Sequence, residues 1–371
     1  MKQEIIDKIN RLASQDEPFL FVINYQADEA FIRKLSYINP EECLFDFEGK
    51  GNFSHARKET WKEEISETTW QIAPPLYEDY EQSFNIVKSN IMAGNSYLTN
   101  LTNRVPVSCN LSLEEIFHRA KGKYKLLLRR KRTQAEDKAH LKEENIEENL
   151  TPFVCFSPET FVRIKGGRIY SYPMKGTLDA SLPNAEKLLM EDRKEAAEHA
   201  TIVDLIRNDL SRVAEDVRVD KYRYVDVLHT NKGDILQTSS EISGRLPEDY
   251  PHHLGEILDA QLPAGSITGA PKDKTMQIIQ EAEGYDRGFY TGIMGIYDQG
   301  ELNSAVMIRF IEEETSPVDF EADGEKNFKA NEGKKPKKSR KLYFKAGGGI
   351  TSKSDCRREY EEVIQKIYLP F

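Results

Sequence analysis

The residue whose type and sequence context most clearly suggest a chemical role is Lys175, in the segment Pro173 to Thr177. The segment has the order Pro-Met-Lys-Gly-Thr, so the lysine lies between a proline-led strand end and a glycine turn. Glycine lets the backbone approach a bound anion, Thr177 offers a hydroxyl, and a partly buried ammonium that loses its proton becomes a nucleophile. A turn with a surface lysine would have the same pattern, so the pentapeptide alone leaves both interpretations open.

A second candidate group is the carboxylate of Glu198, on a predicted helix over residues 185–212. Glu198 shares one helical face with Ile202 and Leu205, because the three follow i, i+4, i+7 spacing. We therefore expect this carboxylate to be at least partly buried. A buried carboxylate requires a cation, so two alternatives stand here, a metal ion or an ion pair with Arg207.

The C-terminal segment offers another helix-borne carboxylate. Ser354 is the predicted N-cap of a helix on which Glu359, Glu362 and Lys366 lie on one face. Glutamates from two helices could bridge one hard divalent ion, and Mg²⁺ prefers oxygen ligands. Considered alone, Glu359 and Glu362 are more typical of a solvated face.

Two glycine-rich turns and one arginine are suited to binding anions. The segment Pro263 to Lys272, which contains Ser266 and Thr268, opens a predicted helix whose free N–H groups favour a carboxylate or a phosphate. Gly347 to Gly349 end a predicted strand and let backbone amides face a ligand closely. Arg309 ends an apolar strand, where its guanidinium could clasp a carboxylate or form a structural salt bridge.

Composition excludes several classes of protein. The 371 residues carry a formal charge of −10, which argues against binding to a phosphate backbone. No apolar run is long enough to span a bilayer and no signal peptide is evident, so we expect a cytoplasmic protein. The cysteines are scattered without a metal-binding or disulfide pattern and are expected to be reduced. They are Cys43, Cys109, Cys155 and Cys356.

The elements that must position these residues favour an α+β fold, an α/β sandwich of antiparallel sheets flanked by helices. The N-terminal part reads as a helix, the strand Phe19 to Ile23 and a further helical stretch, and Tyr77 to Ile91 has helical spacing. Strands then occur in runs joined by hairpin-like turns, which argues against a doubly wound parallel sheet. The predicted strands include Phe161–Ile164, Arg168–Tyr172, Ile235–Glu241, Phe289–Tyr297, Leu302–Phe310 and Leu342–Ala346.

Two runs of charged and polar residues interrupt this pattern. They cover residues 129–150 and 312–341 and contain few aliphatic side chains. Each lies between strand-like segments, so we predict solvated insertions at loop tips.

Together, the motifs resemble the chorismate-utilising enzymes from about Tyr77 to the C-terminus. The resemblance rests on the order of several blocks. These are Ser157-Pro158-Glu159, Pro173 to Thr177, Glu198-His199 with Asp204 to Asp209, Pro263 to Lys272, and Gly347 to Glu362. It implies one large domain with two antiparallel sheets, in which residues 77–371 form the chorismate-binding part and residues 1–76 a short N-terminal part of the same domain. It also implies a Mg²⁺-dependent site and chorismate as the substrate.

The resemblance implies a role for each matching residue. Glu198 and Glu362 match the family's Mg²⁺ ligands, Glu159 its general acid and His229 its active-site histidine. The implied substrate contacts are Gly176, Thr177, Ser266, Thr268, Tyr290, Arg309, Gly347, Gly348 and Gly349.

Two positions distinguish branches of the family. Anthranilate synthases, whose large subunit is the alternative for this chain, resemble the sequence but carry alanine where Lys175 stands. The family members that aminate chorismate at C4 carry this lysine, which implies a covalent adduct at C2 and a neutral amine whose pKa burial lowers. Leu98 occupies the place of a water-activating lysine in isochorismate synthases, so direct hydration is not expected. The chain has no glutaminase nucleophile motif, and the resemblance implies a separate glutamine amidotransferase subunit that supplies ammonia.

Overall fold

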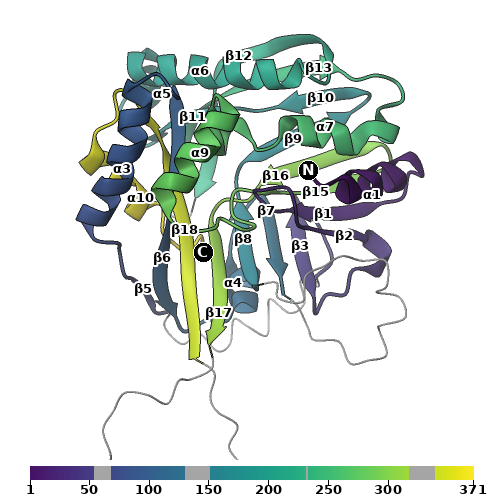
Figure 1. Cartoon of the computed structure of the whole chain (residues 1–371), viewed down its shortest axis with the longest axis horizontal. Helices are drawn as coiled ribbons and strands as arrows, with labels where there is room; N and C mark the ends of the chain where they lie inside the picture. Colours follow the sequence, from purple (N-terminus) through teal and green to yellow (C-terminus); the bar gives the residue numbers. More distant parts are fainter. Residues whose placement is uncertain (54–67, 130–150, 231–232, 317–338) are drawn as a thin grey trace, which may run out of the picture.

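The computed structural model describes residues 1–53, 68–129, 151–230, 233–316 and 339–371. In these ranges, two antiparallel sheets form the centre of the molecule, and helices cover the outer face of each (Figure 1). The predicted α+β sandwich is therefore confirmed. None of the described helices has both the length and the apolar composition that a membrane span requires.

The first sheet has the strand order β11-β13-β10-β9-β16-β15-β1-β2, and β12 pairs with β13. Its strands are β1 (Phe19–Ile23), β2 (Ala30–Lys34), β9 (Thr160–Lys165), β10 (Arg168–Ser171), β11 (Met174–Asp179), β12 (Glu215–Thr230), β13 (Gly233–Arg245), β15 (Ile293–Asp298) and β16 (Glu301–Val306).

The second sheet has the order β14-β6-β18-β17-β8-β7-β3-β4, and β5 pairs with β6. Its strands are β3 (Cys43–Phe47), β4 (Lys50–Gly51), β5 (Trp70–Ile72), β6 (Leu98–Cys109), β7 (Tyr124–Leu128), β8 (Phe153–Ser157), β14 (Gly269–Ala270), β17 (Phe310–Ser316) and β18 (Ser339–Thr351).

Helices cover both sheets on the outside. They are α1 (Gln3–Ser14), α3 (Tyr77–Met92), α4 (Leu113–Arg119), α5 (Ala185–Glu191), α6 (Arg193–Leu210), α7 (Leu254–Gln261), α8 (Gly265–Thr268), α9 (Lys272–Glu283) and α10 (Cys356–Gln365), with short 3₁₀ turns η1 (Leu35–Tyr37) and η4 (Tyr250–His253). Residues of α1, α6 and α7 share a core with the first sheet. Residues of α3, α4, α9 and α10 share one with the second.

The alternating direction of side chains along a strand allows one strand to contribute to two hydrophobic cores. In β1, Phe19, Phe21 and Ile23 face the helices, whereas Leu20 and Val22 enter the core between the sheets. Successive side chains of a strand point to opposite faces, so a fully apolar strand can serve two cores at once. This explains why β1 is buried along its whole length.

Several predicted boundaries are wrong. The helical stretch expected after β1 is instead β2, η1 and β3, because Ala30 to Lys34 pairs with β1 and buries Phe31 and Ile32. The helix expected from Ala185 is broken at Asp192, whose side chain accepts hydrogen bonds from the backbone of Lys194 and Glu195 and starts α6.

The C-terminal helix and the last strands also differ from the prediction. Asp355 caps α10, not Ser354, because the Asp355 side chain accepts a hydrogen bond from the Arg358 N–H. Strands β17 and β18 extend to Ser316 and from Ser339, into both ends of the predicted insertion. The charged side chain of Glu312 can lie within β17 because it forms ion pairs with Arg104 at 2.6 Å and with Lys345 at 2.7 Å. Residues 130–150 and 317–338 of the two predicted insertions lie outside the described residues.

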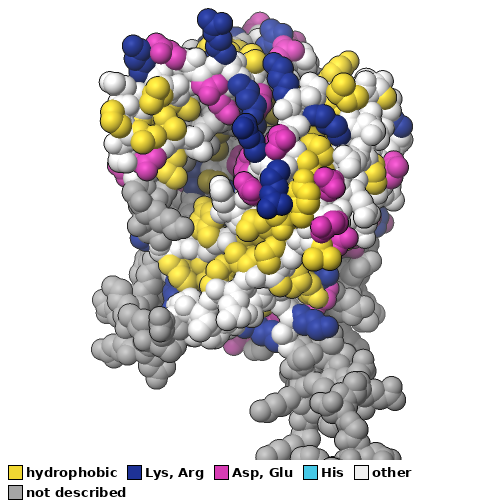
Figure 2. Space-filling model, turned by 90° about the vertical axis from the view of Figure 1, so that its left-hand side faces the viewer, with side chains coloured by type: hydrophobic (Ala, Val, Ile, Leu, Met, Phe, Trp, Pro, Cys, Tyr) yellow, Lys and Arg dark blue, Asp and Glu magenta, His cyan; other side chains and the backbone are white. Residues whose placement is uncertain are grey.

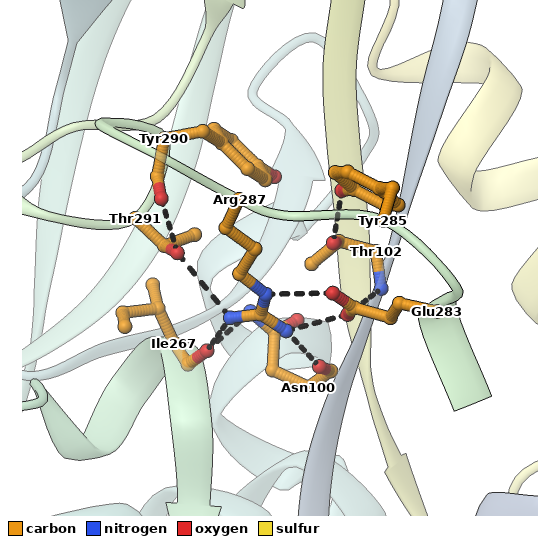
Figure 3. A network of polar contacts seen from close by, with 8 residues as sticks. All are labelled: Asn100, Thr102, Ile267, Glu283, Tyr285, Arg287, Tyr290 and Thr291. Atoms are coloured by element: carbon orange, nitrogen blue, oxygen red, sulfur yellow. Dashed lines mark hydrogen bonds and ion pairs between the residues drawn. The ribbon is translucent and has the colours of Figure 1, made fainter. Parts of the chain in front are cut away.

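A fully buried arginine, Arg287, is the centre of a network of polar contacts (Figure 3). The Arg287 guanidinium donates to both carboxylate oxygens of Glu283, at 2.8 and 2.6 Å. It also donates to the carbonyls of Asn100 (2.7 Å) and Ile267 (2.9 Å). β6, α8 and the end of α9 are thereby fixed relative to one another.

Replacing Arg287 with methionine should destabilise the fold strongly. The side chains of Arg287 and Glu283 are each 1% exposed, so the variant leaves a buried carboxylate without its cation. We expect the free energy of unfolding to fall by about 3–5 kcal/mol, measured by chemical denaturation. The double variant R287M/E283Q, which removes both charges, should recover part of the loss. A single variant as stable as the parent protein would contradict this assignment.

Candidate active site

A cavity of about 480 Å³ opens between α6, the β9–β11 end of the first sheet and β18 of the second. Figure 2 looks onto this side of the molecule, where the surface is hollowed and basic and acidic side chains gather beside the hollow. The sequence-predicted residues that line the cavity are Glu159, Lys175, Glu198, Ser266, Tyr290, Arg309, Gly347, Gly348 and Gly349. Residues from distant parts of the chain therefore meet at one place.

Lys175 reaches the cavity from β11. Its strand pairs with β13, and a bulge at Gly176, whose φ is 76°, shifts the register after Lys175. Bulges commonly re-aim a side chain next to an active site. Lys175 Nζ lies 3.0 Å from Glu198 Oε2, so these two predicted site residues form an ion pair. The alternative ion pair of Glu198 with Arg207 does not occur, since Arg207 pairs with Asp204 at 2.8 Å.

The protonation of Lys175 differs from the expectation. Burial acts to lower the pKa of the Lys175 ammonium, but the charges of Glu198, Glu195 and Glu362 outweigh it and raise the pKa above its ordinary value. The prediction that burial alone would leave a neutral amine is therefore wrong. An ammonium whose pKa is raised keeps its proton more firmly, and such an amine can act as a nucleophile only after it loses that proton.

Two helices each direct a pair of glutamates, spaced i and i+3, at this lysine. Glu195 and Glu198 belong to α6, and Glu359 and Glu362 belong to α10. Burial and the neighbouring Glu198 raise the pKa of Glu195, and burial with Glu362 does the same for Glu359. Burial also acts on Glu362, but Lys366, at 2.7 Å, holds the pKa of that carboxyl below its usual range.

This donor set fits a hard divalent cation chemically. The four side chains present carboxylate oxygens, which Mg²⁺ prefers, and their mutual repulsion is the kind that a cation relieves. Two lysines approach the Glu198 carboxylate, Lys175 at 3.0 Å and Lys194 at 3.7 Å. Within the described ranges, no three His, Cys, Asp or Glu side chains are already gathered as a metal-binding group.

Glu159 is half-buried in the cavity wall, directly before β9. Burial raises the pKa of its carboxyl above the ordinary value, while Ser266, Arg309 and Lys366 act in the opposite direction. Ser266 Oγ donates a hydrogen bond to Glu159 Oε1 at 2.5 Å. A carboxyl that keeps its proton to a higher pH is suited to act as a general acid. Ser266 thus contacts Glu159 directly, in addition to lining the cavity.

Arg309 and Tyr290 provide groups for a carboxylate. Arg309 does not end a strand as predicted, because the apolar stretch divides into β16 and β17 and Arg309 lies between them with φ 57°. It makes no ion pair with any residue in the described ranges, and its buried Nε has no hydrogen-bond partner there. An unpaired guanidinium in a cavity wall is suited to bind an anion. Tyr290, 3% exposed, lines the cavity near it.

The three glycines lie in the last part of β18, before α10, as predicted, but the strand continues through them to Thr351 and does not stop at Ala346. β17 pairs with β18 only as far as Phe310 opposite Lys345, whereas β6 pairs with β18 through Thr351. One edge of β18 is therefore without a strand partner at Gly347 to Gly349, and this edge faces the cavity. A Cβ atom at Gly348 would lie 3.6 Å from Glu359 Oε2, so the absence of a side chain leaves room beside the carboxylates.

Other predicted residues lie elsewhere. Gly176 and Thr177 are in β11 beyond Lys175, and they do not contribute to the described lining of the cavity. Thr268 is fully buried in α8, outside that lining as well. His229 belongs to β12, and its side chain lies outside the described part of the structure. Leu98 does line the cavity, where it presents an apolar side chain.

The sequence interpretation gave no site role to Lys366 and Glu195. Lys366 lines the cavity, donates to the Gly347 carbonyl at 2.9 Å and pairs with Glu362. Its i+4 spacing from Glu362 was an available signal. Glu195, three positions before Glu198, carried the same kind of signal.

The chain matches the family model described as chorismate binding enzyme over residues 2–324. It belongs to this family and is a chorismate-utilising enzyme.

Individual relatives agree with this assignment. A protein of Haemophilus influenzae named "Uncharacterized PabA-like protein" is 43% identical over 368 residues, covering 99% of this chain and 97% of the relative. Aminodeoxychorismate synthase component 1 of Bacillus subtilis is 29% identical over 318 residues, covering 83% of this chain and 58% of the relative. The crystal structure of anthranilate synthase component I from Streptococcus pneumoniae has the same fold, with a TM-score of 0.59, 20% identity and coverage of 94% and 79%.

Proposed function

We propose that this enzyme is an aminodeoxychorismate synthase component I, which converts chorismate and ammonia to 4-amino-4-deoxychorismate. The observation that carries the proposal is Lys175 in the wall of the cavity that also holds Glu159 and Arg309. An amine at this position distinguishes C4 amination from the anthranilate branch, where the resemblance implies alanine. The relative in Bacillus subtilis with that name supports the same reaction.

The reaction begins with attack of the Lys175 amine on C2 of the ring, once its proton has left. The double bond shifts, and the C4–O bond breaks as the Glu159 carboxyl in the cavity wall delivers a proton to the departing hydroxyl. Arg309, which has no acidic partner in the described ranges, binds a substrate carboxylate. Ammonia then bonds to C4, the double bonds shift back, and the C2–N bond breaks with its electron pair returning to Lys175 Nζ.

Glu198 and Glu362 are the residues that would hold Mg²⁺, and the ion would neutralise the ring carboxylate of chorismate. The protein's own contribution is to place Glu198 at 3.0 Å from Lys175, with Glu195 and Glu362 near enough for their charges to act on the same amine.

The proposal includes a glutamine amidotransferase subunit as the source of ammonia. The product would serve para-aminobenzoate and folate synthesis, and we place the enzyme in the cytoplasm. The second candidate is an anthranilate synthase large subunit. The observed cavity lysine argues against it, because no amine is needed when chorismate is aminated at C2.

The identity of the aminated product tests the proposal. Purified protein incubated with chorismate, Mg²⁺ and ammonium chloride should give a product with the mass of aminodeoxychorismate, and an added lyase should convert it to para-aminobenzoate. Incubation without Mg²⁺ is the control for the metal. Formation of anthranilate as the main product would overturn the proposal in favour of the second candidate.

A further inference from the structure

The lining of the cavity includes two buried polar residues that the proposed chemistry does not use. Asp209, at the end of α6, and Gln261, at the end of α7, both line the cavity, although they are only 8% and 3% exposed. The lining of the same cavity also contains apolar side chains. They include Phe161, Val162, Ile202, Ile206 and Leu210.

A short network fixes both residues. Lys272 Nζ lies 2.9 Å from Asp209 Oδ2 and donates to the Gln261 carbonyl at 2.9 Å. Gln261 Nε2 donates to the Asp209 carbonyl at 2.9 Å. These contacts use one carboxylate oxygen of Asp209 and the amide nitrogen of Gln261.

The remaining oxygens, Asp209 Oδ1 and Gln261 Oε1, accept no hydrogen bond from any described residue. Neither is among the polar atoms sealed inside the protein without a partner, so both are open to the cavity that their residues line. A carboxylate oxygen and an amide oxygen in one recess of the cavity form a site for a small ligand with several N–H donors and positive charge.

The recess lies close to the reacting end of the cavity. A Cβ atom on Gly265 would lie 3.3 Å from Asp209 Oδ2, and the next residue, Ser266, holds the acid Glu159. A ligand bound at Asp209 would therefore lie beside the segment Gly265-Ser266, which contacts Glu159. In the proposed reaction Glu159 protonates the departing C4 hydroxyl, and the nitrogen nucleophile must bond to the same carbon.

We propose that Asp209 and Gln261 form the ammonium site of this enzyme. The inference rests on the proposed function and adds the residues that receive its second substrate. Bound ammonium donates N–H bonds to Asp209 Oδ1 and Gln261 Oε1. It transfers one proton to Asp209 Oδ1, and the lone pair of the resulting ammonia forms the bond to C4 while Lys175 leaves C2 with the C2–N electron pair.

The charges around Asp209 are compatible with both steps. Burial raises the pKa of the Asp209 carboxyl, which makes it a better proton acceptor, while Lys272 and Arg212 oppose that shift and favour the ionised form. Lys272 contacts the other oxygen, Oδ2, and so leaves Oδ1 available to a ligand.

The variant Asp209→Asn should raise the KM for ammonium chloride about tenfold or more, because it removes a charge-assisted hydrogen bond. The KM for chorismate should stay unchanged. Since D209N leaves Lys272 without its partner, the double variant D209N/K272M provides a neutral pair and should show the same ammonium defect. Asp204→Asn, on the exposed part of α6, is the matched control and should behave as the parent enzyme. An unchanged KM for ammonium in both Asp209 variants would overturn the site.

Binding can also be measured without turnover. Ammonium chloride should raise the melting temperature of the parent protein relative to tetramethylammonium chloride at equal ionic strength, since the latter cannot donate hydrogen bonds, and this difference should vanish in D209N/K272M. An equal melting temperature in both salts would refute the site. Stabilisation by ammonium without an aminated product would instead contradict the proposed function alone.

Discussion

The variant Lys175→Ala is expected to form 4-amino-4-deoxychorismate about a thousandfold more slowly than the parent enzyme, a loss typical of a catalytic side chain that touches the substrate. The reason is that the amine forms the bond to C2 in the first displacement, and no other described lysine is proposed to attack the ring. Glu198, 3.0 Å from Lys175 Nζ, also loses its closest cation. The rate is measured from single-turnover formation of product at saturating chorismate and ammonium. Residual activity should shift toward the anthranilate-type product.

The variant Lys175→Arg distinguishes the effect of the positive charge at position 175 from the effect of a nucleophilic amine there. Arginine keeps a cation beside Glu198 but does not deprotonate at working pH, so this variant should bind chorismate and still fail to aminate it. Mass spectrometry of the parent enzyme quenched during turnover should detect a chorismate-derived adduct on the Lys175 peptide. Normal aminodeoxychorismate formation by either variant would contradict the covalent step.

Much of the site could be predicted because its residues belong to local patterns. Glu198 follows apolar helical spacing, and Lys175 lies between a strand end and a glycine turn, so both could be found without knowing their neighbours. That they lie 3.0 Å apart could not be predicted, since it depends on how α6 packs against the β11–β13 strands. The sign of the Lys175 pKa shift depends on the same packing, which brings in Glu195 and Glu362.

The errors in the fold have a similar origin. Residues 30–34 have no strong strand pattern of their own, and pairing with β1 decides their conformation. Arg309 interrupts an apolar stretch that reads as one strand, although the chain turns there with φ 57° and passes from the first sheet to the second. Arg287, which connects β6, α8 and α9, lies in a polar segment whose burial no periodicity predicts.

Replacing Glu159 with glutamine should lower kcat by about 10²–10⁴-fold, the usual contribution of a general acid. Glutamine preserves the size of the side chain and can still contact Ser266, which lies 2.5 Å from Oε1, but it has no proton to give to the departing hydroxyl. Binding of chorismate should change little, because Arg309 still provides the cation for a substrate carboxylate. The measurement is kcat against pH for both enzymes.

The pH profile gives the sharper test of the same assignment. Burial raises the Glu159 pKa in the folded protein, so the acid form persists above the pH at which an exposed glutamate would ionise. Activity of the parent enzyme should fall as pH rises through this pKa, and the Glu159→Gln variant should lack that limb. The stability of the fold should also decrease as pH rises. Because the folded state binds the Glu159 proton more tightly than the unfolded chain does, the contribution of this group to the free energy of unfolding is lost as pH rises through the folded-state pKa. Asp204→Asn, which changes an exposed carboxylate elsewhere, should keep the parent profile. A Glu159→Gln enzyme with an unaltered high-pH limb would show that another group is the acid.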